Sequence, residues 1–323
     1  MKIRLWKGYH SQGLRSLLAQ TWSASSNDEM LIACPPFLKD LDFVRQLPAG
    51  EIEFCGEWAG LEIERKAGES RSYAEPPVLG VFTSGTVSGV ARLVLYSRAN
   101  IESSLDAILA LFERSRIETV FCYPQPFHTF GLILGYALPM LRDFQLVTGQ
   151  GRYSRSFHEL RAAQRNERLL TLGTPTHFHD LLSYVREAGI ELAPSYSSIV
   201  GGAMVSVAQW RAIRDFLHVQ APSIGYGATE ASPGVSHLPP GREPLEDGEI
   251  GFAFPHLSVA LHAGRGLEFS GRSLCLAMIQ DGRLEFPKSV LLTDDVRQRD
   301  DGRLVYQGRT ELILNRGGQK YSL

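Results

Sequence analysis

The sequence predicts an α/β fold, with stacked mixed sheets and flanking helices, that continues into a β-rich region resembling a distorted barrel. Up to residue 232, short apolar runs typical of buried strands alternate with segments of helical periodicity. After Pro233 the helical periods disappear, and short β-like runs are separated by Gly and Asp-Gly turns. We therefore expect α/β subdomains over residues 1–232 and a β-rich subdomain over residues 233–314.

The expected elements follow this alternation along the chain. Strands are predicted at 31–34, 52–54, 78–82, 93–96, 119–123, 144–147, 169–172, 197–200 and 221–224. Helices are predicted at 14–22, 37–47, 101–112, 131–141, 157–166 and 208–217, with a further helix beginning at His177. In the β-rich region, strands are predicted at 249–252, 257–261, 273–278, 290–293 and 303–306.

Composition limits the class of protein. The chain has 323 residues, of which 44% are hydrophobic and 21% charged, so it can bury a sizeable core and is neither disordered nor collagen-like. A net charge of −2 gives no long-range attraction to nucleic acid or to an anionic membrane. No run approaches the roughly 20 apolar residues that a membrane span needs. The four cysteines have no metal-type spacing, which indicates a reduced, cytoplasmic compartment.

A loop rich in Thr, Ser and Gly follows the predicted strand at 78–82. Its residues Thr83, Ser84, Gly85 and Thr86 could expose backbone N–H groups and hydroxyls to an anion such as a phosphate. The alternative is an ordinary polar surface turn, which is the commoner origin of such a loop. Because a strand resumes after the loop, the pattern argues against a Walker-type or Rossmann fingerprint.

A second short stretch, 226–230, follows the predicted strand at 221–224. Gly227 would let the backbone approach a ligand closely. Thr229 could donate a hydrogen bond to a phosphate oxygen, and Glu230 could hold a hard cation such as Mg²⁺.

Histidines and small residues mark further candidate positions. His128 precedes the apolar helix at 131–141, where it could either only pack or form a wall of a ligand pocket. His177 and His179 are two positions apart and do not share a helix face, so we expect a helix start there and not a metal site. The segment 201–203, Gly-Gly-Ala, leaves room for a flat ring beside the backbone.

Taken together, these stretches resemble the adenylate-forming superfamily of acyl- and aryl-CoA ligases, adenylation domains and luciferases, and specifically its large N-terminal domain. The matching stretches are 83–94, 127–132, 226–230 and the series Thr293-Asp294-Asp295, Asp301-Gly302 and Gly308-Arg309, with 201–203 on the adenine side. Their order and spacing agree with the family from about residue 78 to the end.

The resemblance implies roles for these residues in binding ATP. The residues implied to bind the nucleotide are Thr83, Ser84, Gly85 and Thr86 at the phosphates, Gly202 and Ala203 at the adenine with Tyr226 stacking near it, Gly227 where the backbone approaches the ligand, Asp295 at the ribose hydroxyls, and Arg309 near the ribose or phosphate. The residues implied to act in the reaction are Thr229 at the α-phosphate, Glu230 holding Mg²⁺, and His128 beside the carboxylate substrate.

The implied reaction is that of an AMP-forming acid–thiol ligase. A carboxylate attacks the α-phosphate of ATP, giving acyl-AMP and pyrophosphate, and the acyl group then passes to CoA or to the phosphopantetheine of a carrier protein. This chemistry needs positioning and charge neutralisation more than a protein nucleophile. Small residues such as Gly201 and Gly225 favour an aromatic or medium-chain acyl acid, and no Asp in 126–131 is present to pair with an amino acid.

The chain also departs from the family pattern. The lysine usual in the phosphate loop is replaced by Ala91, and Arg92 could substitute with a different reach and geometry. Asp294 stands where Gly is usual. Residues 315–323 resemble the hinge before a small C-terminal domain, which leaves open a chain cut at the hinge or a naturally short one. A separate C-terminal domain or an acyl carrier protein is therefore an expected partner, and a non-catalytic nucleotide- or acyl-adenylate-binding or scaffold protein is the alternative function.

Overall fold

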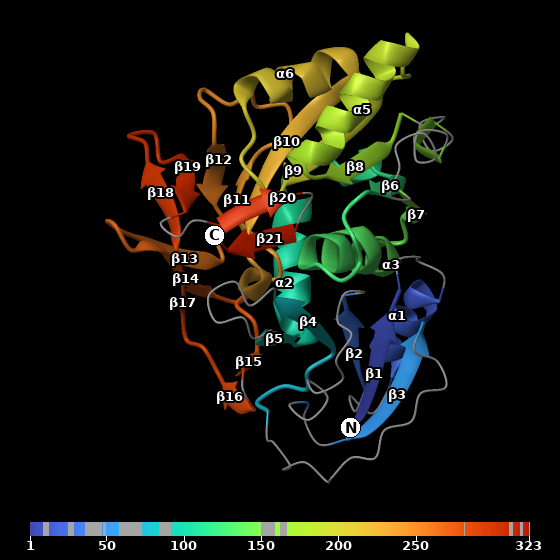
Figure 1. Cartoon of the computed structure of the whole chain (residues 1–323), viewed down its shortest axis with the longest axis vertical. Helices are drawn as coiled ribbons and strands as arrows, with labels where there is room; N and C mark the ends of the chain where they lie inside the picture. The colour runs from blue at the N-terminus through green and yellow to red at the C-terminus, as the bar shows by residue number, and fades with distance from the viewer. Residues whose placement is uncertain are drawn as a thin grey trace.

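The computed structural model contains two large stacked sheets with helices between and outside them. It describes residues 1–8, 13–24, 29–35, 47, 50–57, 73–83, 92–149, 159–161, 167–280 and 282–309, together with the backbone of 313–316 and 319–322. Figure 1 shows the sheet that contains the N-terminal strands at one end of the molecule and helices α5 and α6 at the other. The α/β class expected from the sequence is confirmed.

The first sheet is mixed and has the strand order β16-β15-β5-β4-β2-β1-β3. Its strands are β1 (Lys2–Lys7), β2 (Glu29–Cys34), β3 (Glu51–Gly56), β4 (Leu79–Thr83), β5 (Arg92–Tyr96), β15 (Ala277–Gln280) and β16 (Arg283–Glu285). Strands β3, β1, β2 and β4 run parallel, whereas β5, β15 and β16 continue the sheet as antiparallel neighbours.

The second sheet has the order β18-β19-β12-β11-β10-β9-β8-β6-β7. Its strands are β6 (Thr119–Cys122), β7 (Gln145–Thr148), β8 (Leu169–Gly173), β9 (Ser195–Gly201), β10 (Val219–Gly227), β11 (Gly234–Leu238), β12 (Glu249–Ala253), β18 (Asp294–Gln298) and β19 (Leu304–Arg309). The strands from β7 to β10 are parallel, and those from β11 onward are antiparallel.

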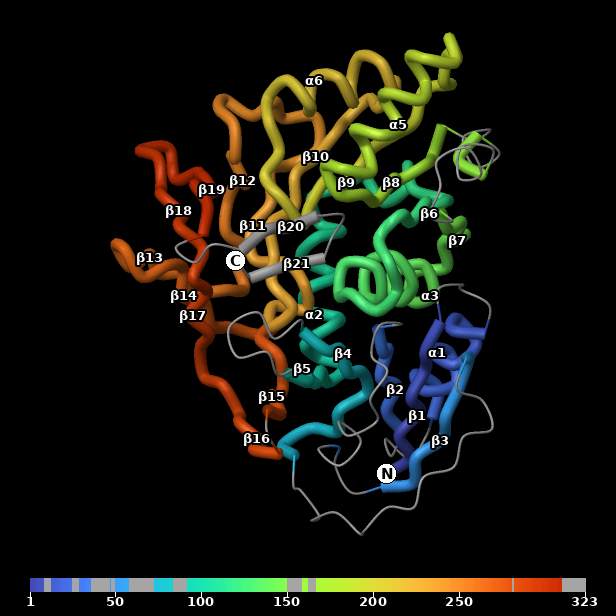
Figure 2. Tube along the Cα trace, in the orientation of Figure 1, coloured from blue at the N-terminus to red at the C-terminus, as the bar shows by residue number. Residues whose placement is uncertain are grey.

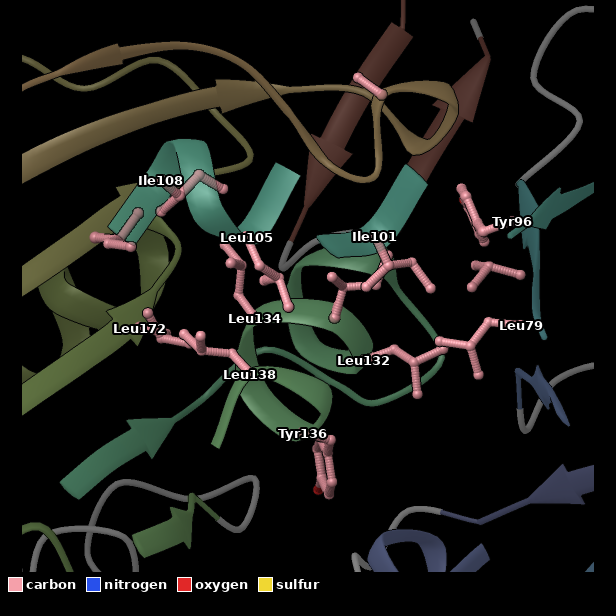
Figure 3. Packing of buried hydrophobic residues seen from close by; sticks show 14 of the residues in the cluster. Leu79, Tyr96, Ile101, Leu105, Ile108, Leu132, Leu134, Tyr136, Leu138 and Leu172 are labelled. Carbon is pink, nitrogen blue, oxygen red and sulfur yellow. The ribbon is translucent and has the colours of Figure 1, made fainter. Parts of the chain in front are cut away.

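The helices occupy distinct layers. They are α1 (Leu14–Ser23), α2 (Arg98–Leu109), the π-helix η3 (Phe130–Ala137), α3 (Leu138–Arg142), α5 (Pro175–Ala188) and α6 (Val207–Phe216), with 3₁₀ turns η2 (Arg114–Arg116) and η4 (Thr229–Ala231). Apolar side chains of α2 and η3 pack between strands of the two large sheets, as Figure 3 shows for Ile101, Leu105, Leu132 and Leu134. Helices α5 and α6 pack on the outer face of the second sheet.

Strands that follow residue 232 are built into both large sheets. Among the described residues, β15 and β16 join the first sheet, and β11, β12, β18 and β19 join the second. The remaining strands form a three-stranded sheet of β13 (Leu257–His262), β14 (Gly266–Gly271) and β17 (Val290–Leu292), and a pair of β20 (Ile313–Arg316) and β21 (Gln319–Ser322). In Figure 2, strands β13, β14, β17, β18 and β19 lie on one side of the molecule, and the chain continues downward there to β15 and β16.

Several expected elements differ in detail. The segment expected as one helix at 131–141 is a π-helix followed by a short α-helix. The chain passes very close to its neighbours there, because a Cβ on Gly131 would lie 2.1 Å from the Gln125 carbonyl oxygen and one on Gly135 would lie 2.2 Å from Cys122 Sγ. The expected helix at 37–46 lies outside the described residues, as does most of the one at 157–166, of which 159–161 is helical.

Strand β1 was not expected, because its apolar residues are interrupted by charges. The side chain of Arg4 is 9% exposed and forms ion pairs with Glu29 and Glu53 on the two neighbouring strands. Burying a charge in a sheet is tolerated when partners of opposite charge surround it. The partners come from residues 25 and 49 positions away, which local sequence patterns cannot reveal.

Candidate active site

A cavity of about 390 Å³ lies at the ends of the central strands of the second sheet. Strands β9, β10 and β11, the start of η3, helix α2 and strands β18 and β19 all contribute to its lining. The lining is uneven in exposure, because Gly202, Ala203 and Met204 are exposed whereas Ile108, Ile199 and Phe254 are buried. We call the side of the cavity at 202–204 its outer end and the side at Ile108, Ile199 and Phe254 its buried end.

The stretch 226–230 forms the turn at the outer end. Strand β10 ends at Gly227, and the backbone then closes on itself, with Ala228 N donating to the Pro233 carbonyl oxygen at 3.0 Å. A Cβ on Gly227 would lie 1.8 Å from that same oxygen, so only glycine fits. The turn is held from the first sheet as well, because Tyr96 Oη donates to the Thr229 carbonyl oxygen at 2.7 Å. As a result, Tyr226, Gly227 and Thr229 line the cavity.

Three side chains from three strands form a hydrogen-bonded cluster beside this turn. Tyr226 Oη donates to Asp294 Oδ2 at 2.7 Å, and Arg309 Nε donates to Asp294 Oδ1 at 2.5 Å. All three residues line the cavity. Burial raises the pKa of the Tyr226 hydroxyl, and the Asp294 carboxylate raises it further. Burial opposes the charge of Arg309, but Asp294 outweighs this effect and the pKa of Arg309 is raised.

The structure places Asp294, and not Asp295, at the cavity. Asp294 pairs with Arg309 and Asp295 with Gly308 across β18 and β19, and successive side chains of a strand point to opposite faces. Asp294 is accordingly 4% exposed and lines the cavity, whereas Asp295 is exposed and does not line it. The sequence resemblance had assigned the ribose-binding role to Asp295. For Asp295 to face the cavity, β18 would have to be shifted by one residue relative to β19.

Glu230 lies behind the turn, where it meets a cation from the first sheet. Its Oε1 atom is 3.5 Å from Arg92 Nη1, and the side chains of Glu230 and Arg92 are 12% and 37% exposed. Arg92 Nε also donates to Gln280 Oε1 at 3.1 Å. Thr83 pairs with Arg92 across β4 and β5, so the start of the predicted phosphate loop lies beside this ion pair. Thr83 and Glu230 do not themselves line the cavity, and Ser84, Gly85 and Thr86 lie outside the described residues.

The other predicted positions lie on the cavity wall. His128 is half-buried and lies two residues before the start of η3, where its carbonyl oxygen accepts from Leu132 N at 2.7 Å. Gly202 and Ala203 follow β9, and Gly202 has a φ of +85°, a value that favours glycine. These residues and the 226–229 turn therefore surround one space, although they are far apart in the sequence.

Two further histidines line the cavity without having been assigned to it from the sequence. His177 belongs to the capping box of α5, in which Thr174 Oγ1 lies 2.8 Å from His177 Nδ1, and burial lowers the pKa of His177 to about 4. The helix start expected there is confirmed. His237 lies on β11, and burial lowers its pKa to about 3. Strand β11 was not expected, and its alternation over 234–238 is the only sequence signal that could have placed His237 on an inward face.

Comparisons with known proteins agree with this geometry. The sequence pattern of the AMP-binding enzyme family matches residues 23–269. The chain is 24% identical to human mitochondrial medium-chain acyl-CoA ligase ACSF2 over 56% of its length and 30% of that protein. It is 25% identical to the acyl-CoA ligase SID4 of Ajellomyces capsulatus over 74% of its length and 44% of that protein.

Solved structures show the same fold at low sequence identity. A variant of E. coli MenE with bound OSB-AMS has a TM-score of 0.72 and 15% identity, with 99% of this chain and 70% of that chain covered. The N-terminal domain of FACL13 from Mycobacterium tuberculosis has a TM-score of 0.73 and 12% identity, with 95% of this chain and 86% of that chain covered.

The chain thus has the same fold as these solved structures, one of which is an N-terminal domain. The chain belongs to the AMP-binding enzyme family. It spans less than half the length of the two curated relatives described above. No helix among its described residues is long and apolar enough to cross a membrane. All four cysteines are free and buried.

Proposed function

We propose that this domain activates a carboxylic acid with ATP, giving an acyl-AMP and pyrophosphate. The observation that carries the proposal is the single cavity shared by the 226–229 turn, His128, Gly202 and the Asp294–Arg309 pair. The outer end offers hydrogen-bonding and charged groups for a nucleotide, and the buried end offers apolar walls for an acyl group. A cavity with a few convergent polar groups in an apolar lining is the usual form of a small-molecule site.

The nucleotide would lie at the outer end. Gly202 and Ala203 present backbone without large side chains, which leaves room for the adenine ring beside Tyr226. Asp294 already accepts two hydrogen bonds, and a carboxylate has about four acceptor positions, so it can also accept from ribose hydroxyls. Arg309 neutralises Asp294 and remains next to the ribose or phosphate. We thus propose Asp294 for the role that the sequence resemblance gave to Asp295.

The reacting phosphate would lie against the 226–229 turn. Thr229 lines the cavity at the start of η4, where its hydroxyl can donate to an α-phosphate oxygen. His128, on the opposite wall, would border the carboxylate of the acid. Holding both reactants in one pocket lowers the entropic barrier to their reaction. The acid's oxygen attacks phosphorus, and pyrophosphate leaves with the electron pair of the broken P–O bond.

A magnesium ion fits the residues present beside the turn. One carboxylate, here Glu230, together with substrate phosphates and water is a common way for proteins to hold Mg²⁺. Glu230 is 9% exposed and directly follows Thr229, so it is close to where the phosphates would lie. When bound, the ion would neutralise phosphate charge.

Arg92 is proposed as the cation that replaces the lysine missing from the phosphate loop. It stands next to Thr83 in the sheet and reaches Glu230 with Nη1, so its guanidinium is at the phosphate side of the turn. A guanidinium offers several N–H donors in a fixed plane, which suits phosphate oxygens. In the absence of nucleotide, Arg92 and Glu230 neutralise each other.

The substrate is proposed to be an aromatic or medium-chain acyl acid, and the acceptor to be CoA or a carrier-protein phosphopantetheine. The named activities of the relatives, medium-chain acyl-CoA ligase and acyl-CoA ligase, support this class. An acyl carrier protein or a separate C-terminal domain would be the protein partner. The free, buried cysteines support a reducing, cytoplasmic compartment.

Acid-dependent exchange of pyrophosphate into ATP tests the proposal. The domain would be assayed with a panel of acids, alone and with a C-terminal domain from a related ligase added in trans. Exchange that depends on both an acid and Mg²⁺ is the expected result. Binding of AMP or an acyl-AMP mimic without exchange under either condition would instead favour a non-catalytic binding protein on this fold.

A further inference from the structure

The buried end of the cavity holds a polar side chain that the proposed reaction does not use. His237 on β11 is 3% exposed and lines the cavity. Its Nε2 atom is buried and has no hydrogen-bond partner among the residues that the structure describes. Each nitrogen of a neutral imidazole is either a donor or an acceptor, and buried polar atoms of this kind are normally paired. Because the His237 ring lines the cavity, a ligand in the cavity is the candidate partner for the imidazole.

The surroundings of His237 are apolar on both sides. Its ring centroid is 5.8 Å from that of Phe112 and 6.1 Å from that of Phe254, and Phe254 also lines the cavity. Burial keeps the imidazole neutral, because it lowers the pKa of His237 well below its usual value. The ring therefore offers a hydrogen bond and not a charge.

The facing strand leaves this ring accessible from the cavity. Gly225 on β10 is paired with His237 across the β10–β11 ladder, and it also lines the cavity. A Cβ added to Gly225 would lie 3.4 Å from His237 Nδ1 and 3.5 Å from Cε1. Because glycine has no side chain, nothing from this position covers the imidazole edge.

We infer that His237 is a specificity-determining residue that hydrogen-bonds an uncharged polar group, such as a hydroxyl or carbonyl, on the acyl part of the substrate. The inference rests on the proposed function, since it requires an acyl-AMP in the cavity. A plain alkyl or aryl acid leaves the imidazole unpaired, whereas a hydroxy or keto acid of the same length pairs it. A second carboxylate would lose its hydration beside Phe254, which disfavours dicarboxylic acids.

Binding of non-hydrolysable acyl-AMP mimics tests the inference without turnover. Acyl-sulfamoyl adenosines would be compared by calorimetry in matched pairs, in which a hydroxyl or keto group is moved along hexanoyl and octanoyl chains and around a benzoyl ring. For the wild type we expect at least one polar mimic to bind about tenfold more tightly than its plain parent, the size of one good buried hydrogen bond. His237→Phe keeps a ring of similar size and should abolish this preference while binding the plain parent at least as well.

Two further variants separate hydrogen bonding from pocket shape. His237→Gln, whose amide both donates and accepts, should retain part of the preference, and Phe254→Leu, which changes shape without removing a polar atom, should retain it fully. Plain parents that bind as tightly as every polar mimic, or a preference that survives in His237→Phe, would overturn the inference and leave the proposed function standing. Failure of all mimics, polar and plain, to bind would overturn the proposed function and the inference with it.

Discussion

The two ends of the cavity differ in how their polar atoms are satisfied. At the outer end, Asp294 and Arg309 pair with each other before any ligand arrives, as Glu230 and Arg92 do beside the 226–229 turn. At the buried end, His237 Nε2 has no partner in the described chain. Under the proposed function, the nucleotide end is organised in advance by fixed residues, whereas the acyl end leaves a polar atom to be satisfied by the acid.

The largest loss of stability and of AMP affinity should come from removing Asp294 from its hydrogen-bonded cluster with Tyr226 and Arg309. Asp294→Ala leaves Arg309 partly buried without its counter-ion and removes the acceptor of the Tyr226 hydroxyl. We expect about 2–3 kcal/mol less stability toward urea, below the full value for a buried pair because the Arg309 side chain is 25% exposed. AMP affinity measured by calorimetry should fall at least about tenfold.

Asp295→Ala is the matched control for this prediction. It removes a carboxylate from the adjacent, exposed position, so stability should change by less than about 0.5 kcal/mol. AMP binding should be unchanged. A larger loss of AMP affinity in Asp295→Ala than in Asp294→Ala would show that the ribose is bound on the other face of β18.

The next effect is the loss of folding stability at acid pH that His237, at the buried end of the cavity, should cause. The pKa of His237 is about 3 in the folded protein and about 6.5 in an unfolded chain, so the unfolded state takes up the proton first as pH falls. The stability that a neutral His237 contributes is therefore present above about pH 6.5 and is lost as pH falls from there toward the folded pKa. His237→Phe should remove this loss, which amounts to about 2 kcal/mol at about pH 5.

Urea unfolding of the wild type and His237→Phe between pH 7 and pH 5 measures this difference. His179→Phe is the control, because His179 is exposed. The stability of His179→Phe should change with pH in the same way as that of the wild type. Parallel curves for the wild type and His237→Phe would mean that the imidazole is hydrated or paired in solution.

A third, smaller effect is expected for Arg92, whose removal should weaken the binding of Mg·ATP but not that of AMP. Arg92→Ala should weaken Mg·ATP binding about three- to tenfold, the scale of one exposed charge-assisted contact, and leave AMP binding nearly unchanged. Arg92→Lys should recover part of the loss. Arg168→Ala, which removes an exposed arginine paired with Glu118, is the control and should change neither affinity. Equal losses for ATP and AMP in Arg92→Ala would place Arg92 away from the β- and γ-phosphates.

The smallest effect is that of one hydroxyl in the outer cluster. Tyr226→Phe removes the donor to Asp294 Oδ2 and should cost about 1 kcal/mol in urea unfolding. In the Tyr226→Phe/Asp294→Asn double-mutant cycle the two losses should not add, because they remove the same interaction. Additive losses would show that the hydroxyl contributes independently of Asp294.

Much of the fold could be predicted because its strands are apolar and its helices periodic. Strands such as β2, β4, β6, β8 and β9 are buried along most of their length, and they appear in the sequence as short, mostly apolar runs. Strand β1 was missed because the ion partners of Arg4 lie on other strands. The π-helix was expected as an α-helix, since apolar periodicity does not show how closely Gly131 and Gly135 approach the neighbouring chain.

Sequence reasoning found the segments of the site better than their individual side chains. The 226–230 turn, His128 and the 201–203 segment line one cavity or border it. Which of Asp294 and Asp295 faces the cavity depends on strand register, which the sequence motif does not specify. The ion pair of Arg92 with Glu230 joins two sheets, and 138 positions of sequence separate its members.

The sequence by itself determined the α/β class and the family, because apolar periodicity and short motifs are local properties of the chain. Tertiary structure decided which carboxylate faces the cavity, which cation meets Glu230 and which histidine at the buried end lacks a partner among the described residues. These are decided by strand register and by packing between the two sheets, and both arise only when distant segments come together.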